Sequence, residues 1–226
     1  MCIIAIYTAG KRPTAESIKT MMTRNADGAG VAWNDGKAVH FKKGFTTPAE
    51  VMEYIRLADE RGARDIVFHS RIATSGGVSP AKCHPFPVST KNDVLNATEG
   101  EGKTPLFFHN GVFAVQLEKG LSDTQTFVKY SLAPLFRADA RGVFRGVYDE
   151  LIDMATAGSR VAIIYPNRVV NFGTWTRDEG ILYSNYTFRK WNYATSYSYG
   201  GEWEYNEDGR MVWKAYDGKG GATYEK

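Results

Sequence analysis

The order of strand-like and helix-like segments constrains the fold of this chain more than any other feature. Short apolar runs typical of strands lie on both sides of grouped helical segments. The expected strands cover residues 2–7, 28–33, 38–41, 66–72, 105–109, 161–165, 169–172 and 181–184. The expected helices start near residue 14 and cover 48–60, 124–135 and 146–157. Because strands and helices do not alternate regularly, this order predicts α+β layers rather than repeated βαβ units.

Composition favours a globular domain and excludes several classes of protein. The 226 residues are 43% hydrophobic and 13% aromatic, enough for a sizeable core in one domain or one domain with an appendage. The 28 basic and 25 acidic residues nearly cancel, so the net charge of +3 and the pI of about 8.7 do not indicate nucleic-acid binding. No apolar stretch is long enough to span a membrane. We expect neither a nucleic acid nor a membrane as a partner.

The cysteine count points to a reducing compartment. The chain contains only Cys2 and Cys83. A secreted disulfide scaffold would contain more cysteines, and no CxxC pair is present for a structural zinc ion. The apolar start is too short for the hydrophobic region of a signal peptide. We therefore expect a cytoplasmic protein with reduced thiols.

Cys2 is the first candidate for chemistry. Methionine is normally removed before a small second residue, which would leave this cysteine at the N-terminus. Its α-amine, with a pKa near 8 in reference peptides, could then accept the thiol proton and later protonate a leaving group. Taken alone, however, Cys2 is better explained as the start of a buried strand.

Five further segments follow Cys2 in a fixed order. They are 24–30 (RNADGAG), 69–76 (HSRIATSG), 83–86 (CHPF), 109–111 (HNG) and 122–125 (SDTQ). In this order and spacing they resemble the RGxDSxG, HTRWATHG, NAHP, HNG and SDTE segments of class II glutamine amidotransferases. Each segment alone is weakly specific, but together with Cys2 they form a specific resemblance that covers about residues 1–185.

The resemblance implies a fold and a division of the chain. The family has the N-terminal-nucleophile (Ntn) hydrolase fold, a four-layer αββα sandwich with two mostly antiparallel sheets. We expect this domain to cover residues 1–190. The residues 191–226 are crowded with aromatic residues, glycine and charge, and form an appendage. Within this segment, Trp203 and Trp213 could pair in a hairpin. Equally, the segment could be a mobile tail or an element that docks on a partner.

The resemblance also implies the catalytic residues, and elementary chemistry agrees. Cys2 would attack the amide, and the side chain of Asn110 and the backbone N–H of Gly111 would bind the oxyanion. A glycine there permits close approach and an unusual backbone angle. Asn-Gly is also typical of a type I′ hairpin turn, so we expect a turn whose donors point at the substrate.

An amino-acid substrate explains the remaining family positions. Arg71 can bind the α-carboxylate of glutamine with two parallel hydrogen bonds, and Asp123 can bind its α-ammonium group. The resemblance assigns the same two roles and adds Thr74 as support for the carboxylate. Arg24 and Asp27 are expected to orient the new N-terminus, although a salt-bridged loop explains them nearly as well.

Some positions depart from the family pattern. Ile3, Asn25 and Ile72 replace a glycine, a glycine and a tryptophan. Ser75 replaces a histidine near the glutamine pocket and is the change most relevant to substrate choice. His69 and His109 are expected to be hydrogen-bonded core histidines.

Cys83 and His84 are sequence neighbours that could be mistaken for a catalytic pair. Adjacent residues in an extended segment point to opposite faces, so we do not expect them to act together.

These residues predict hydrolysis of the glutamine side-chain amide to glutamate and ammonia through a Cys2 thioester, without a metal or organic cofactor. About 40 residues follow the resemblance, too few for an ammonia-using domain, so a separate enzyme is a possible acceptor. Two alternatives stay open. One is a stand-alone γ-glutamyl or small-amide hydrolase, and the other is a non-catalytic descendant that binds an amino acid.

Overall fold

A computed structural model describes residues 2–72, 78–138, 145–189, 201–205, 211–216 and 222–225. The chain divides into two compact units, Met1–Phe188 and Arg189–Lys226. The interpretation of these units as a catalytic domain and an appendage stays a prediction. No helix in the described part of the chain is both long and apolar enough to cross a membrane.

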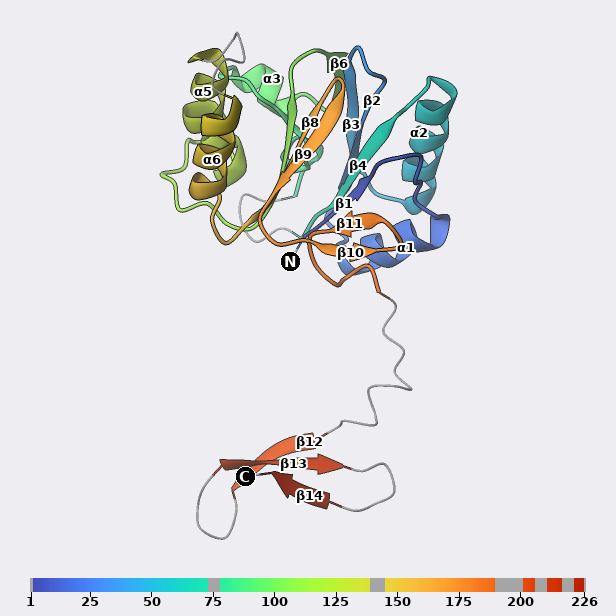
Figure 1. Ribbon diagram of the computed structural model, residues 1–226, viewed down its shortest axis with the longest axis vertical. Helices are drawn as coiled ribbons and strands as arrows, with labels where there is room; N and C mark the ends of the chain where they lie inside the picture. The colour runs from blue at the N-terminus through green and yellow to red at the C-terminus, as the bar shows by residue number, and fades with distance from the viewer. Residues whose placement is uncertain are drawn as a thin grey trace. The chain divides into compact units, whose positions relative to one another are not determined.

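Seven antiparallel strands form the larger sheet of the first unit, in the order β10-β11-β1-β4-β2-β3-β6 (Figure 1). Their bounds are β1 Ile3–Tyr7, β2 Ala29–Asn34, β3 Val39–Phe45, β4 Asp65–Ser70, β6 Glu99–Gly102, β10 Thr176–Asp178 and β11 Ile181–Tyr183. The interior strand β1 pairs with β4 and β11 and is buried along its whole length. This position explains the unbroken apolar run at the start of the sequence.

Helices α1 (Ala15–Arg24) and α2 (Pro48–Glu60) cover the outer face of this sheet (Figure 1). Both begin with a capping box, in which the side chains of Thr14 and Thr47 accept hydrogen bonds from the backbone. In α2 the buried residues are Val51, Ile55 and Ala58, whereas Leu57 is 42% exposed. Leu57 is therefore not part of the apolar face, because it lies off the helical stripe that the other three residues define.

A second sheet has four antiparallel strands in the order β5-β7-β8-β9. These are β5 Phe86–Pro87, β7 Leu106–Asn110, β8 Arg160–Tyr165 and β9 Arg168–Phe172. The two sheets share an apolar core in which Ile4 and Ile6 of β1 pack with Phe108 of β7 and Ala162 of β8. The alternate residues of β1 face α1 and α2 instead, as the period of two in a strand requires.

Helices also cover the outer face of the second sheet (Figure 1). They are α3 Asn92–Asn96, α4 Asp123–Phe127, the π-helical turn η2 Val128–Leu132, α5 Ala133–Ala138 and α6 Arg145–Ala155; a 3₁₀ turn, η1, covers Pro80–Lys82. The helix predicted for 124–135 is present but contains the π turn, which apolar periodicity does not distinguish from α-helix. The order helices–sheet–sheet–helices confirms the predicted four-layer αββα fold.

The second unit contains a three-stranded antiparallel sheet of β12 (Gly201–Tyr205), β13 (Met211–Tyr216) and β14 (Ala222–Glu225). Trp203 lies directly opposite Trp213 in the β12–β13 pair, so the strand pairing that the hairpin alternative required is present. The third strand was not predicted. Residues 206–210, which include the expected turn glycine, lie outside the described residues.

All four histidines of the chain, His40, His69, His84 and His109, are buried in the first unit. His109 is within 3.0 Å of the hydroxyls of Thr124 and Ser159, as expected for a hydrogen-bonded core histidine. The ring of His69 instead packs against the ring of His84, with ring centroids 4.2 Å apart and the planes tilted by 40°, and neither ring has a well-formed hydrogen bond in the described part of the chain. For His69 the expectation of a hydrogen-bonded side chain was wrong, because its strand turns it into the apolar space between the sheets.

The lowered pKa values of His69, His84 and His109 predict that the protein loses stability in acid. Burial lowers the pKa of His69 to about 3 and that of His109 to about 4, and lowers the pKa of His84 well below its usual value. Below about pH 6.5 the unfolded chain therefore binds more protons than the folded chain. We expect the free energy of unfolding to fall as the pH falls from about 6.5 towards 4, by ~1.4 kcal/mol per pH unit for each histidine.

Denaturant unfolding at several pH values tests this expectation in the wild type and in His84→Phe. The substitution keeps a planar ring but removes one titrating group. The slope of the unfolding free energy against pH should therefore decrease by the equivalent of about one bound proton. An unchanged slope would show that His84 is charged, or accessible to protons, in the folded protein.

Candidate functional site

The three residues proposed for catalysis line one cavity of about 200 Å³. Cys2 stands just before β1, and Asn110 and Gly111 stand at the end of β7 in the facing sheet. The full set of described lining residues is Cys2, Ile72, Asn110, Gly111, Val112, Gly158, Arg160, Ser184 and Asn185. The two sheets therefore place a thiol beside amide and backbone donors, the groups that acyl transfer requires.

The Cys2 thiol is held by the chain that follows β4. Its Sγ lies 3.4 Å from the backbone nitrogen of Ile72 and 3.5 Å from the Ile72 carbonyl oxygen. Burial raises the pKa of the thiol, although the Ile72 N–H and the nearby charge of Arg71 partly oppose this effect. The thiol is thus protonated at neutral pH, and a nucleophilic role requires a base.

The Asn110 amide is held in one orientation. Its Nδ2 donates to the Ser184 hydroxyl at 2.9 Å, and the same hydroxyl accepts from the backbone N–H of Ile4 at 2.8 Å. Asn110 is buried, and its second amide hydrogen is available to a molecule in the cavity. The role of this amide as an oxyanion donor stays a prediction.

Position 111 requires a glycine because neighbouring side chains leave no room for a Cβ atom, and not because of its backbone angle. A Cβ atom at this position would overlap the Ser159 hydroxyl and the ring of His109. Neither Asn110 nor Gly111 has a positive φ, so the expected type I′ turn and unusual backbone angle are wrong. The physical reason is that β7 does not end in a tight hairpin, since the chain leaves it for the helical layer before returning as β8.

Neither Arg71 nor Asp123 lines the Cys2 cavity in the described part of the chain, and their substrate-binding roles stay predictions. Arg71 is buried at the end of β4, and its charge lowers the pKa of both cysteine thiols. Asp123 begins α4 and accepts a hydrogen bond from the Phe113 backbone at 2.9 Å. One carboxylate oxygen of Asp123 is thus already engaged.

The supporting residues are described only in part. The backbone N–H of Asp27 donates to the Arg71 carbonyl at 2.9 Å, and the Arg71 N–H donates to Gly28 at 2.9 Å, so this loop fixes the Arg71 backbone. Arg24 reaches the Thr187 carbonyl at 3.5 Å. Thr74 and Ser75 lie outside the described residues, and their roles stay predictions.

Cys83 and His84 do not form a catalytic pair, as predicted. The Cys83 thiol faces the backbone carbonyls of Asp27 and Ser79, at 3.9 and 3.7 Å. The His84 ring instead packs against the rings of His69 and Phe86.

Sequence reasoning missed Ser184 and Asn185, which directly follow β11. The Asn185 Nδ2 donates to the Cys2 carbonyl at 2.6 Å, and its Oδ1 accepts from the Thr187 backbone at 3.0 Å. Together, Ser184 holds the side chain of Asn110 and Asn185 holds the main chain of Cys2. The sequence gives only a weak signal for these two residues, because their contacts with Cys2 and Asn110 arise from the pairing of β11 with β1.

Replacing Asn185 by alanine should misplace Cys2 without unfolding the protein. Loss of one hydrogen bond to the nucleophile's backbone should lower kcat about 10-fold and leave KM nearly unchanged. Steady-state amide hydrolysis, with thermal unfolding as a check on folding, measures this effect. Asn171→Ala on β9, at an exposed position, is the matched control. An equal kcat in both variants would exclude a positioning role for Asn185.

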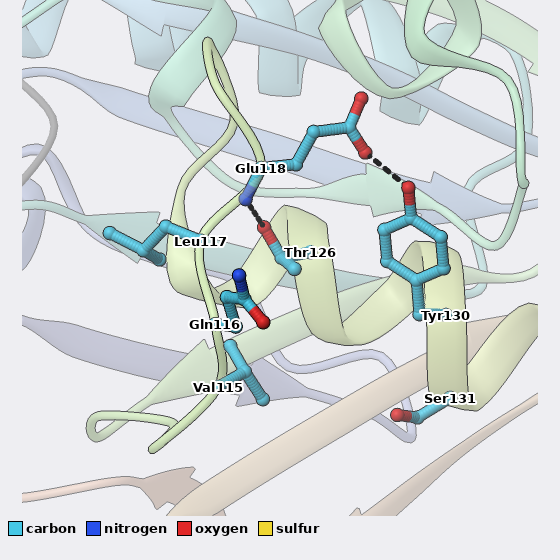
Figure 2. Close-up of a pocket in the computed structure, with 7 residues that line it drawn as sticks. All are labelled: Val115, Gln116, Leu117, Glu118, Thr126, Tyr130 and Ser131. Atoms are coloured by element: carbon cyan, nitrogen blue, oxygen red, sulfur yellow. Dashed lines mark hydrogen bonds between the residues drawn. The ribbon is translucent and has the colours of Figure 1, made fainter.

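A second and larger cavity, about 500 Å³, lies beside α4 and η2 (Figure 2). It is lined by residues 115–118 and by Thr126, Tyr130 and Ser131. Glu118 bridges this region by accepting from the Tyr130 hydroxyl at 2.8 Å and from Lys129 at 2.6 Å. The cavity contains none of the nucleophile or oxyanion residues, so its size does not make it the candidate active site.

No group of three or more histidine, cysteine or acidic residues is arranged to bind a metal ion within the described ranges. The expectation that no cofactor is needed stays a prediction.

Comparisons with known proteins support the fold. No protein-family model matches the sequence, and no curated protein matches it. Among solved structures, the glutamine phosphoribosylpyrophosphate (PRPP) amidotransferase from B. subtilis in complex with ADP and GMP superimposes with a TM-score of 0.52 and 13% identity. A structure described as the allosteric regulatory enzyme of purine biosynthesis superimposes with a TM-score of 0.55 and 16% identity.

Both matches cover 81% of this chain but only 41% and 42% of the matched chains. The chain thus spans about two fifths of the length of these proteins. At such low identity the likeness establishes a shared fold, and it agrees with the α+β Ntn-hydrolase architecture described above.

Proposed function

We propose that this chain is an N-terminal-nucleophile amidohydrolase that hydrolyses the side-chain amide of glutamine. The observation that carries the proposal is the single cavity in which the Cys2 thiol meets the oxyanion donors Asn110 and Gly111. The fold shared with a glutamine PRPP amidotransferase supports the choice of glutamine.

The reaction begins when residue 2 carries a free α-amine. That amine accepts the proton of the thiol, whose raised pKa makes such a base necessary. The sulfur attacks the amide carbon, and the resulting oxyanion accepts hydrogen bonds from Asn110 Nδ2 and the Gly111 N–H. The ammonium group then protonates the departing nitrogen, which leaves as ammonia. Water, activated by the same amine, cleaves the Cys2 thioester to release glutamate.

Substrate binding and the fate of ammonia complete the proposal. Arg71, with Thr74, would bind the α-carboxylate of glutamine, and Asp123 would bind the α-ammonium group through its second oxygen. Ammonia would pass to a separate acceptor enzyme. We also propose a cytoplasmic location, since both cysteines are free thiols.

Intact mass spectrometry with the glutamine-mimicking electrophile diazo-oxo-norleucine tests the proposal. We expect purified protein that begins at Cys2 to gain one adduct on that residue, and excess glutamine to prevent the reaction. Protein that begins at Cys2 but gains no adduct, and releases no glutamate from glutamine, would refute glutamine hydrolysis. Protein in which Cys2 keeps a preceding residue would refute the amine-base mechanism.

A further inference from the structure

Arg160 is the first residue of β8 and lies directly opposite Asn110 in the β7–β8 pair. Residues that face each other in an antiparallel pair project from the same side of the sheet, with Cβ atoms about 5 Å apart. Ala162 and Ile164, at alternate positions of β8, belong to the core between the sheets. Arg160 therefore extends from the face that carries the oxyanion donor, at the edge of that core.

The guanidinium of Arg160 is held at the cavity, and no described lining residue carries a negative charge that would neutralise it. Its Nε donates to the Thr174 carbonyl at 3.3 Å, and its terminal nitrogens have no acceptor within the described part of the chain. Arg160 is the one charged side chain among the described residues that line the Cys2 cavity, and none of them is acidic. The neighbouring Gly158 leaves open space, since a Cβ there would meet no atom within 4 Å.

Arg160 is also separate from the residues proposed to bind the amino-acid end of the substrate. Arg71 and Asp123 do not line this cavity in the described residues, whereas Arg160 and the oxyanion donor do. A substrate held by Arg71 and Asp123 presents its amide carbon to Cys2, so Arg160 faces the part of the substrate beyond that carbon. Free glutamine has only an NH₂ group there, and that group gives a guanidinium nothing to bind.

We propose that Arg160 forms a subsite for a carboxylate on the amine part of the substrate. The substrates that fit are γ-glutamyl amides whose amine carries a carboxylate, such as γ-glutamyl amino acids. This inference rests on the proposed Cys2 mechanism and extends its substrate class from glutamine to γ-glutamyl amides. The same C–N bond breaks, the amine leaves as a protonated amino acid in place of ammonia, and water cleaves the thioester to glutamate. A planar guanidinium pairs with a carboxylate through two parallel hydrogen bonds.

A matched pair of substrates tests the subsite. Glutamate release is measured from γ-glutamylglycine, from its C-terminal amide, which lacks the carboxylate, and from glutamine. The wild type should show a kcat/KM at least about 10-fold higher for γ-glutamylglycine than for its amide, the effect expected of hydrogen bonds to a charged group. In Arg160→Gln this ratio should fall to about one, and in Arg160→Lys to an intermediate value. Arg177→Gln, at an exposed position of β10, is the control and should keep the wild-type ratio.

The outcomes separate the two proposals. Equal kcat/KM values for γ-glutamylglycine and its amide in the wild type, with glutamate released from all three compounds, would overturn the subsite and leave Cys2 catalysis standing. A preference that survives in Arg160→Gln would also overturn it. Release of glutamate from none of the three by protein with an N-terminal Cys2 would refute the proposed function, and the subsite with it. The substrate comparison in the wild type gives a result even where a variant does not fold.

Discussion

Replacing Cys2 by alanine should abolish amide hydrolysis and leave the fold intact. Loss of a covalent nucleophile removes the thioester route entirely, so kcat should fall by about 10⁴-fold or more. The described hydrogen bonds of the thiol are to the Ile72 backbone, and the strand that follows Cys2 is held by β4 and β11. Thermal unfolding should therefore change little while glutamate release from glutamine disappears.

Cys83 supplies the matched control for this experiment. It is the other cysteine of the chain, it is buried, and burial raises the pKa of its thiol. A protonated, buried thiol reacts slowly with electrophiles. Cys83→Ala should thus keep the glutaminase activity and the single diazo-oxo-norleucine adduct, whereas Cys2→Ala should lose both. Activity that survives in Cys2→Ala, or an adduct that disappears in Cys83→Ala, would contradict the assignment of the nucleophile.

Local signals in the sequence predicted most of the secondary structure. The capping residues Thr14 and Thr47 and the apolar stripe of α2 fix two helices through contacts within a few residues. The Trp203–Trp213 pairing was one of the alternatives that the sequence left open, because the two tryptophans are close in sequence. The short strands β5, β6 and β10 were missed, because they have few residues and depend on neighbours that are distant in the sequence.

The candidate site could be predicted only where the resemblance supplied it. Cys2 and Asn110 are far apart in sequence and meet because β1 and β7 lie in facing sheets, which periodicity does not reveal. Ser184, Asn185 and Arg160 were missed for the same reason. Their contacts follow from the β1–β11 and β7–β8 pairings, so they become visible only once the strand order is known.

Replacing Asn110 by alanine should remove one of the two oxyanion donors. We expect kcat to fall about 10²–10³-fold with little change in KM, because this hydrogen bond forms fully only when negative charge develops on the substrate oxygen. Folding should be preserved, since the Asn110 side chain makes its described hydrogen bond to Ser184 alone. Initial rates over a range of glutamine concentrations separate the two parameters.

The Ser184 hydroxyl provides a sharper version of the same test. If Ser184 acts by orienting the Asn110 amide, Ser184→Ala should lower kcat about 10-fold, and the double variant should be no slower than Asn110→Ala alone. Additive losses in the double variant would show instead that Ser184 acts independently, through the Ile4 backbone that it also binds.

A normal kcat in Asn110→Ala would place the oxyanion elsewhere in the cavity, with Gly111 and Arg160 as the remaining donors to examine.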